Sequence, residues 1–173
     1  MDTLALLRTA LCAACLPLAT AAAESGRDGA VQVRYEQPEG FTESRRSFES
    51  ERQRSGWLTE LARHVEKRAA VRLADGQRLE ITVTDIDRAG ETELWRGGAQ
   101  ASDLRIVRDL YPPRIDLHFV LRDAQGGVLR QGERRLRDID FMSRPGRLRD
   151  DDRLRYEKAL LDDWLDREFG RAG

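Results

Sequence analysis

The sequence predicts a single α+β domain, with a mostly antiparallel sheet of three to five strands and two main helices packed on one face. Two periodicities support this class: several short segments alternate apolar and polar residues, as half-buried strands do, and two longer segments repeat apolar residues every three to four positions, as amphipathic helices do. The predicted order is strand, helix, two to four strands, helix. Packing both helices on one face of a curved sheet is the simplest way to bury their apolar sides.

Residues 1–23 are predicted to form a secretory signal peptide. An apolar run from Leu4 to Leu18 holds one basic residue, Arg8, and small residues follow it up to Ala23, where we expect cleavage. The run is shorter than the roughly 20 apolar residues that a membrane-spanning helix needs. We therefore expect a periplasmic protein with no membrane span in its mature chain. A lipoprotein attached through Cys15, a secreted form and a buried N-terminal helix are the alternatives.

Both cysteines of the chain, Cys12 and Cys15, fall within the predicted signal peptide. The mature chain would therefore form no disulfide, use no thiol nucleophile and bind no zinc through cysteine. The formal net charge is -1 although 35% of residues are charged, so the surface carries both signs. This balance argues against a general nucleic-acid binder, and we expect no nucleic-acid partner.

The N-terminal half begins with a linker, a strand and a helix. Small and polar residues over 24–30 predict a flexible linker, followed by one domain over residues 31–170. Apolar and polar residues alternate over 31–35, which predicts the first strand. A helix is predicted over about 55–70, and the charged stretch 43–54 before it is either an extension of that helix or a loop. Its apolar face consists of Trp57, Leu58, Leu61, Ala62, Val65 and Ala69.

Three further strands are predicted in the centre of the chain. One covers residues 79–84, with a short partner strand expected around 70–73. Residues 115–121 and 128–141 are expected to pair as a hairpin around Gly126-Gly127. The apolar residues of the returning strand change parity between Leu136 and Ile139. Such a change requires a bulge or a break, because a slip of one residue moves every side chain to the opposite face.

The last helix and one irregular stretch complete the chain. Apolar residues repeat at helical spacing over about 154–169, three aspartates precede them, and Gly170 is a plausible C-terminal cap. Residues 85–113 show no strong period. So long an irregular stretch is unusual inside a compact domain, where such loops often carry function.

Several segments resemble those of a known family. The matching segments are Pro38–Thr42, Thr84–Glu91, Asp103–Asp109, Tyr111–Ile115, and Tyr156–Lys158 with Leu160, Leu161 and Trp164. Together they resemble the exported bacterial proteins called domain of unknown function 3016 (DUF3016), over nearly all of the mature chain. The resemblance implies an exported single-domain protein of unknown function and brings no catalytic residues with it.

Clustered acids make the irregular stretch a candidate functional loop. Asp85, Asp87, Glu91 and Asp103 follow a strand and could ligate a hard cation such as calcium. They do not match the spacing of the helix-loop-helix calcium motif. The competing interpretation is that Asp85 and Asp87 accept hydrogen bonds from local backbone amides. They would then pair with one of the nearby arginines, namely Arg88, Arg105, Arg108 or Arg114.

Arginines in the same stretch form a second candidate site. Arg105, Arg108 and Arg114 could grip the phosphate or carboxylate groups of an anionic ligand, because a guanidinium makes planar, bidentate contacts. Asp103, Asp109 and Asp116 interleave with these arginines along the chain and could instead neutralise them.

No standard catalytic or nucleotide-binding signature is present in the sequence. It contains neither H-E-x-x-H nor G-x-S-x-G nor a phosphate-binding G-x-x-x-x-G-K motif. We therefore assign no catalytic residue, metal or cofactor, and expect a non-catalytic envelope binding or interaction module. Its expected partner is an anionic envelope component or another periplasmic protein. The alternative is a metal-assisted hydrolase that uses the acids around residues 85 to 103.

Overall fold

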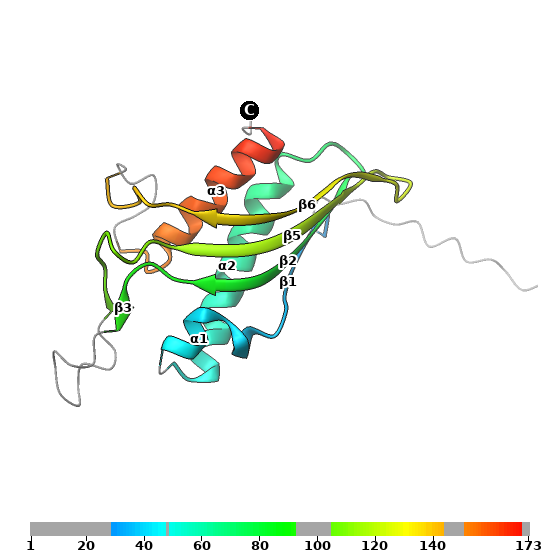
Figure 1. Cartoon of the computed structure of the whole chain (residues 1–173). Helices are drawn as coiled ribbons and strands as arrows, with labels where there is room; N and C mark the ends of the chain where they lie inside the picture. The colour runs from blue at the N-terminus through cyan, green and yellow to red at the C-terminus, as the bar shows by residue number, and fades with distance from the viewer. Residues whose placement is uncertain (1–28, 48, 93–104, 144–150, 171–173) are drawn as a thin grey trace, which may run out of the picture.

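The computed structural model describes residues 29–47, 49–92, 105–143 and 151–170. Four strands form one sheet in the order β1-β2-β5-β6, in which β1 runs parallel to β2 and the other neighbours are antiparallel (Figure 1). The predicted α+β class with a mostly antiparallel sheet is confirmed, and one parallel pair makes the sheet mixed. The four strands are β1 (Val31–Tyr35), β2 (Arg78–Asp87), β5 (Arg114–Arg122) and β6 (Val128–Arg137).

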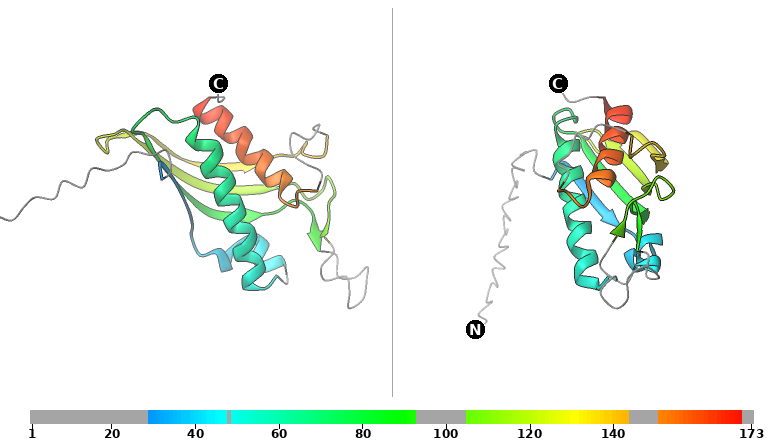
Figure 2. Two further views of the ribbon diagram at one scale, coloured as in Figure 1. Left: turned by 180° about the vertical axis from the view of Figure 1, so that it is seen from behind. Right: turned by 90° about the vertical axis from the view of Figure 1, so that its left-hand side faces the viewer.

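Two long helices cover one face of this sheet. Helices α2 (Glu51–Ala70) and α3 (Arg155–Phe169) lie side by side behind the strands of Figure 1 and in front of them in the left view of Figure 2. The described residues leave most of the opposite face uncovered (Figure 1). A short 3-10 turn (Pro38–Gly40), the five-residue helix α1 (Thr42–Arg46) and the small pair β3 (Glu91–Thr92) with β4 (Arg105–Ile106) lie near one end of the sheet.

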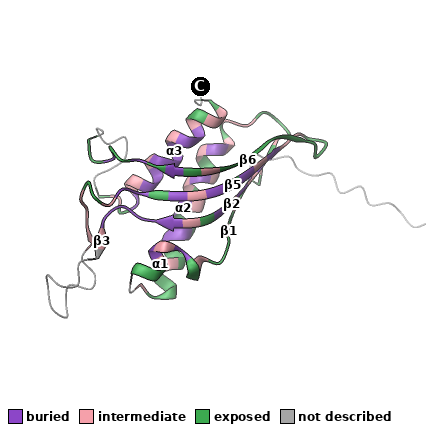
Figure 3. Ribbon diagram, in the orientation of Figure 1, coloured by how far each residue is buried: buried purple, intermediate pink, exposed green. Residues whose placement is uncertain are grey.

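The core lies between the sheet and the two helices. Alternate residues of β2 and β5 face the helices and are buried, while their neighbours on the open face are more exposed (Figure 3). A register shift between Val83 and Asp85 brings Ile86 back to the buried face. Phe119 packs edge-on against Trp164, with ring centroids 5.7 Å apart.

The charged stretch 43–54 is divided between two helices. Helix α2 begins at Glu51 because Ser50 and Gln53 form a capping box, in which each side chain bonds the other's backbone amide. Helix α1 ends at Arg46, so it is a separate element. The predicted helix therefore starts four residues earlier than the apolar period indicates, and its buried residues are the predicted ones except Ala62, which is half-buried.

Two details of the predicted sheet differ in the structure. No strand forms around 70–73, because α2 continues to Ala70 and β1 is the partner of β2 on that side. Strand β6 ends at Arg137 instead of reaching 141. The predicted break is present: Phe141 beyond it is buried, while Ile139 is 65% exposed.

The extreme N-terminus is outside the described residues. The predicted signal peptide 1–23 and most of the linker 24–30 fall there, so both stay predictions. Among the described residues, no helix is long and apolar enough to cross a membrane.

Candidate functional site

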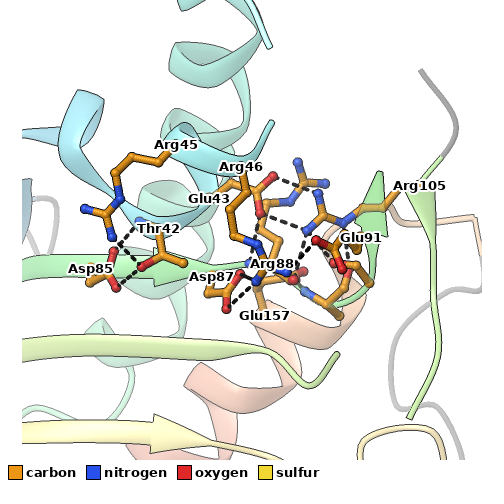
Figure 4. A network of polar contacts seen from close by, with 12 residues as sticks. Thr42, Glu43, Arg45, Arg46, Asp85, Asp87, Arg88, Glu91, Arg105 and Glu157 are labelled. Carbon is orange, nitrogen blue, oxygen red and sulfur yellow. Dashed lines mark hydrogen bonds and ion pairs between the residues drawn. The ribbon is translucent and has the colours of Figure 1, made fainter. Parts of the chain in front are cut away.

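The end of β2 carries the acids that the sequence singles out. Because side chains alternate along a strand, burial of Ile86 turns Asp85 and Asp87 toward the opposite face, where α1 lies (Figure 4). Together with charged side chains of α1, the turn after β2, β3, β4 and α3, they form a group that we call the charged cluster: Glu43, Arg46, Asp85, Asp87, Arg88, Glu91, Arg105 and Glu157.

Asp85 holds the start of α1. Its Oδ1 accepts the backbone N–H of Thr42 at 2.6 Å, and its Oδ2 accepts the Thr42 hydroxyl at 2.7 Å. The first amides of a helix have no partner within the helix, and a carboxylate there also complements the helix dipole. The carboxylate of Asp85 therefore joins β2 to α1.

Glu43 and Arg105 form a bidentate ion pair at the centre of the cluster. Arg105 Nη1 donates to Glu43 Oε1 at 2.7 Å, and Nη2 donates to Oε2 at 2.8 Å. The Glu43 side chain is only 2% exposed and also accepts the backbone N–H of Arg88 at 3.1 Å. A buried carboxylate is tolerated only when its charge is paired and its oxygens are bonded, and both conditions hold here.

The remaining donors of Arg105 bind the turn between β2 and β3. Its guanidinium donates to the carbonyl oxygens of Ala89 at 2.6 Å, Arg88 at 2.8 Å and Gly90 at 2.9 Å. Gly90 adopts a φ of +80°, and a Cβ there would lie 2.6 Å from the carbonyl oxygen of Ile106. A glycine is therefore needed where β3 and β4 approach each other.

Arg46 pairs with two of the predicted site acids. Its guanidinium contacts Asp87 at 3.3 Å and Glu91 at 2.6 Å. The hydrogen bond from Arg46 lowers the pKa of Glu91. Burial raises the pKa of Asp87, and the charge of Arg46 opposes that effect.

Glu157 of α3 closes the cluster from inside the domain. It is 1% exposed, and its Oε1 accepts the backbone N–H of Ala89 at 2.7 Å, whereas Oε2 has no partner among the described residues. Burial raises the pKa of this carboxyl above its ordinary value. Its neighbour Arg88 donates to Glu49 at 2.9 Å and lies 5.3 Å from the Trp57 ring centroid.

The structure brings some predicted site residues together and separates others. Asp85, Asp87, Glu91 and Arg105 belong to the charged cluster, and Asp103 lies outside the described residues. Of the other two predicted arginines, Arg108 is half-buried in the loop before β5. Arg114 is exposed on the open face, where it stands directly opposite Asp87 of β2.

Three members of the cluster were not singled out from the sequence. Glu43 and Arg46 stand in a charged stretch without a clear period. The sequence pattern could have identified Glu157, because this residue lies three positions after Leu154 and four before Leu161, on the apolar side of its helix. An acid at a core-facing helical position indicates a buried polar contact.

The cluster offers little space for a ligand. The hollow at its surface has a volume of about 10 Å³, which admits no more than about one water molecule. Within the described residues, no group of three or more histidine, cysteine, aspartate or glutamate side chains is arranged to hold a metal ion. The described geometry serves to join α1, β2, β4 and α3.

Comparison with known proteins gives one match. A family model described as protein of unknown function (DUF3016) matches residues 29–167, which is most of the chain. Neither the search of curated proteins nor that of solved structures gave a match.

Proposed function

The chain belongs to the DUF3016 family, and we propose that it is a non-catalytic interaction module of the bacterial envelope, exported to the periplasm. One observation carries this proposal. The acids and arginines that look reactive in the sequence hold α1, β2 and β4 together through ion pairs and backbone hydrogen bonds. Side chains committed to these contacts are poor candidates for acid-base chemistry or metal ligation.

The metal-assisted hydrolase has no support from the described residues. For a cation to bind Asp87 and Glu91, both would have to give up Arg46, and Asp85 would have to release the start of α1. Each exchange would replace a charge-assisted contact already present in the fold. Of the four acids in that hypothesis, Asp103 alone is outside the described residues.

Of the arginines predicted to bind an anionic ligand, only exposed ones remain candidates. Arg105 points into the domain toward Glu43, so reversing its charge would disturb folding and would not report on ligand binding. Arg114 is exposed at the surface, where its charge also acts on Asp87 and Asp116. An envelope partner would therefore meet the open sheet face or a strand edge rather than the charged cluster.

Export rests on the N-terminal sequence. The apolar run, the small residues up to Ala23 and the absence of cysteine after Cys15 fit a domain that is exported and folds without disulfides. These features motivate the periplasmic assignment.

The proposal is tested by locating the protein and then measuring its retention on envelope material. The full chain with a C-terminal tag should appear in the periplasmic fraction as a species that begins at Glu24, and a Leu11→Arg variant should stay uncleaved in the cytoplasm. The purified periplasmic form should be retained on at least one of three matrices: peptidoglycan sacculi, lipopolysaccharide, or immobilised envelope proteins. A cytoplasmic location, or retention on none of the three, would overturn the proposal.

A further inference from the structure

We propose that the outer edge of β6 is a strand-addition site for an extended acidic segment of a partner protein. This inference rests on the proposed function, because it names the surface and the kind of partner that the interaction module would use. In strand addition, a peptide pairs its backbone with a free sheet edge, and its side chains supply specificity.

Strand β6 provides a long free edge. Among the described residues, it is the last strand in the sheet order and pairs with β5 along one side only. In Figure 1 no described segment runs along its outer side. An antiparallel edge strand turns half of its backbone N–H and C=O groups outward. Over its ten residues, twice the five of β1 at the opposite edge, these groups can pair with a segment of useful length.

The charge of β6 selects the partner. The strand contains four arginines and one glutamate, Glu133. Two copies of this edge would bring the same arginines together, and like charges placed opposite each other destabilise a pair of strands. An acidic strand would place opposite charges there instead. The composition therefore disfavours self-association and favours an acidic partner.

Two of the arginines lie where a partner's carboxylates would reach them. Arg135 and Arg137 are exposed, and their cross-strand neighbours Asp116 and Arg114 lie on the open face. Arg137 stands directly opposite another arginine, and the described residues offer it no hydrogen bond or ion pair. Carboxylates at alternate positions of an added strand would meet Arg135 and Arg137, next to a position where two arginines stand opposite each other in the register of the sheet.

The helix side of β6 holds this edge in a fixed shape. Arg134 donates to Glu168 of α3 at 2.8 and 3.0 Å, and its guanidinium lies 5.1 Å from the Phe119 ring centroid. Arg130 also contacts Glu168. These contacts tie β6 to α3, so an incoming strand would meet an edge that is already ordered and would lose less entropy on binding.

The test measures binding of a labelled seven-residue peptide that alternates glutamate and valine, by fluorescence anisotropy, to the purified periplasmic form. We expect saturable binding that weakens at least tenfold in the Arg135→Glu/Arg137→Glu variant. The matched control, Arg63→Glu/Lys67→Glu, makes the same charge change on the exposed side of α2 and should bind like the wild type. Equal weakening in both variants would overturn the site, because it would show attraction to net charge alone.

A second peptide tests the backbone pairing. N-methylation of every backbone amide keeps the side-chain charges and removes the donors on both edges of the peptide, so binding should be lost. Unchanged binding would overturn strand addition. Analytical ultracentrifugation gives a second check: a wild-type dimer that is monomeric in the Arg135→Glu/Arg137→Glu variant would show that the edge pairs with a second copy of the chain, and would also overturn the proposal. If the peptide fails to bind while envelope retention persists, this inference falls and the proposed function stands. If retention fails as well, both fall.

Discussion

Replacing Arg105 by methionine tests whether the charged cluster is structural. Methionine keeps much of the side-chain length and removes all five donors. It leaves Glu43, 2% exposed, without its charge partner, and leaves the carbonyls of Arg88, Ala89 and Gly90 without their common donor.

The expected cost follows from the burial of the pair. Removing one partner of a buried ion pair costs about 3–5 kcal/mol, because the other charge stays behind uncompensated. The Arg105 side chain is 21% exposed, so water reaches part of the site and we expect the lower end, about 3 kcal/mol. For a domain of this size, that loss corresponds to a fall in Tm of about 10 °C.

Urea unfolding followed by circular dichroism measures this effect. The Glu43→Gln/Arg105→Met variant no longer carries an unpaired buried carboxylate at position 43. This double variant should therefore be more stable than Arg105→Met alone by at least about 1 kcal/mol. The exposed Arg137→Met variant is the matched control and should stay within about 0.5 kcal/mol of wild type. A loss below about 1 kcal/mol in Arg105→Met would refute the structural role of the pair.

Three further predictions concern the same region. Gly90→Ala should lower the melting temperature more than Gly126→Ala. Both glycines have positive φ, but of the two only Gly90 would bring its new Cβ against a backbone atom, the carbonyl oxygen of Ile106. Equal falls in melting temperature would contradict this close contact between Gly90 and Ile106. Glu157→Gln should raise stability near neutral pH and lose this advantage near pH 4. Burial raises the pKa of Glu157 in the folded state, so wild-type stability falls as pH rises above the ordinary value of 4.5. Parallel pH profiles for the two proteins would contradict a raised pKa for this carboxyl. Asp85→Ala should cost about 1–2 kcal/mol in urea unfolding because α1 loses the acceptor for Thr42, whereas an unchanged midpoint would rule out that contact.

The sequence predicted the elements whose period is strong. Leu79, Ile81 and Val83 alternate clearly, and they form the core face of β2 as expected. Boundaries were less predictable, because they depend on local contacts. Helix α2 starts at Glu51 through a capping box, which the apolar period alone does not show.

The charged cluster was predicted only in part, for a physical reason. The acids of β2 were singled out, and one competing interpretation assigned them to backbone amides and arginines. The structure agrees on the type of partner, because Asp85 accepts a backbone amide and Asp87 pairs with an arginine. The partners themselves, Thr42 and Arg46, lie more than 40 residues away in the sequence. Contacts of this range are set by how α1 folds back onto β2, and no local pattern reports them.

The parallel pairing of β1 was also beyond the sequence pattern. Alternation in Val31–Tyr35 shows that one face of the strand is buried but not which neighbour it takes. The direction is decided by the chain passing through α1 and α2 before it returns as β2, because such a crossover allows two strands to run parallel.

The most direct test of the central claim is the melting temperature of the purified protein with and without millimolar calcium or magnesium, together with calorimetric titration of each metal. If the acids of β2 and β3 are held by Arg46 and α1, neither metal should release heat or shift the melting temperature. A stabilising shift with either metal that disappears in the Asp87→Asn/Glu91→Gln variant would contradict this account. It would show that these acids release their present partners to form a metal site.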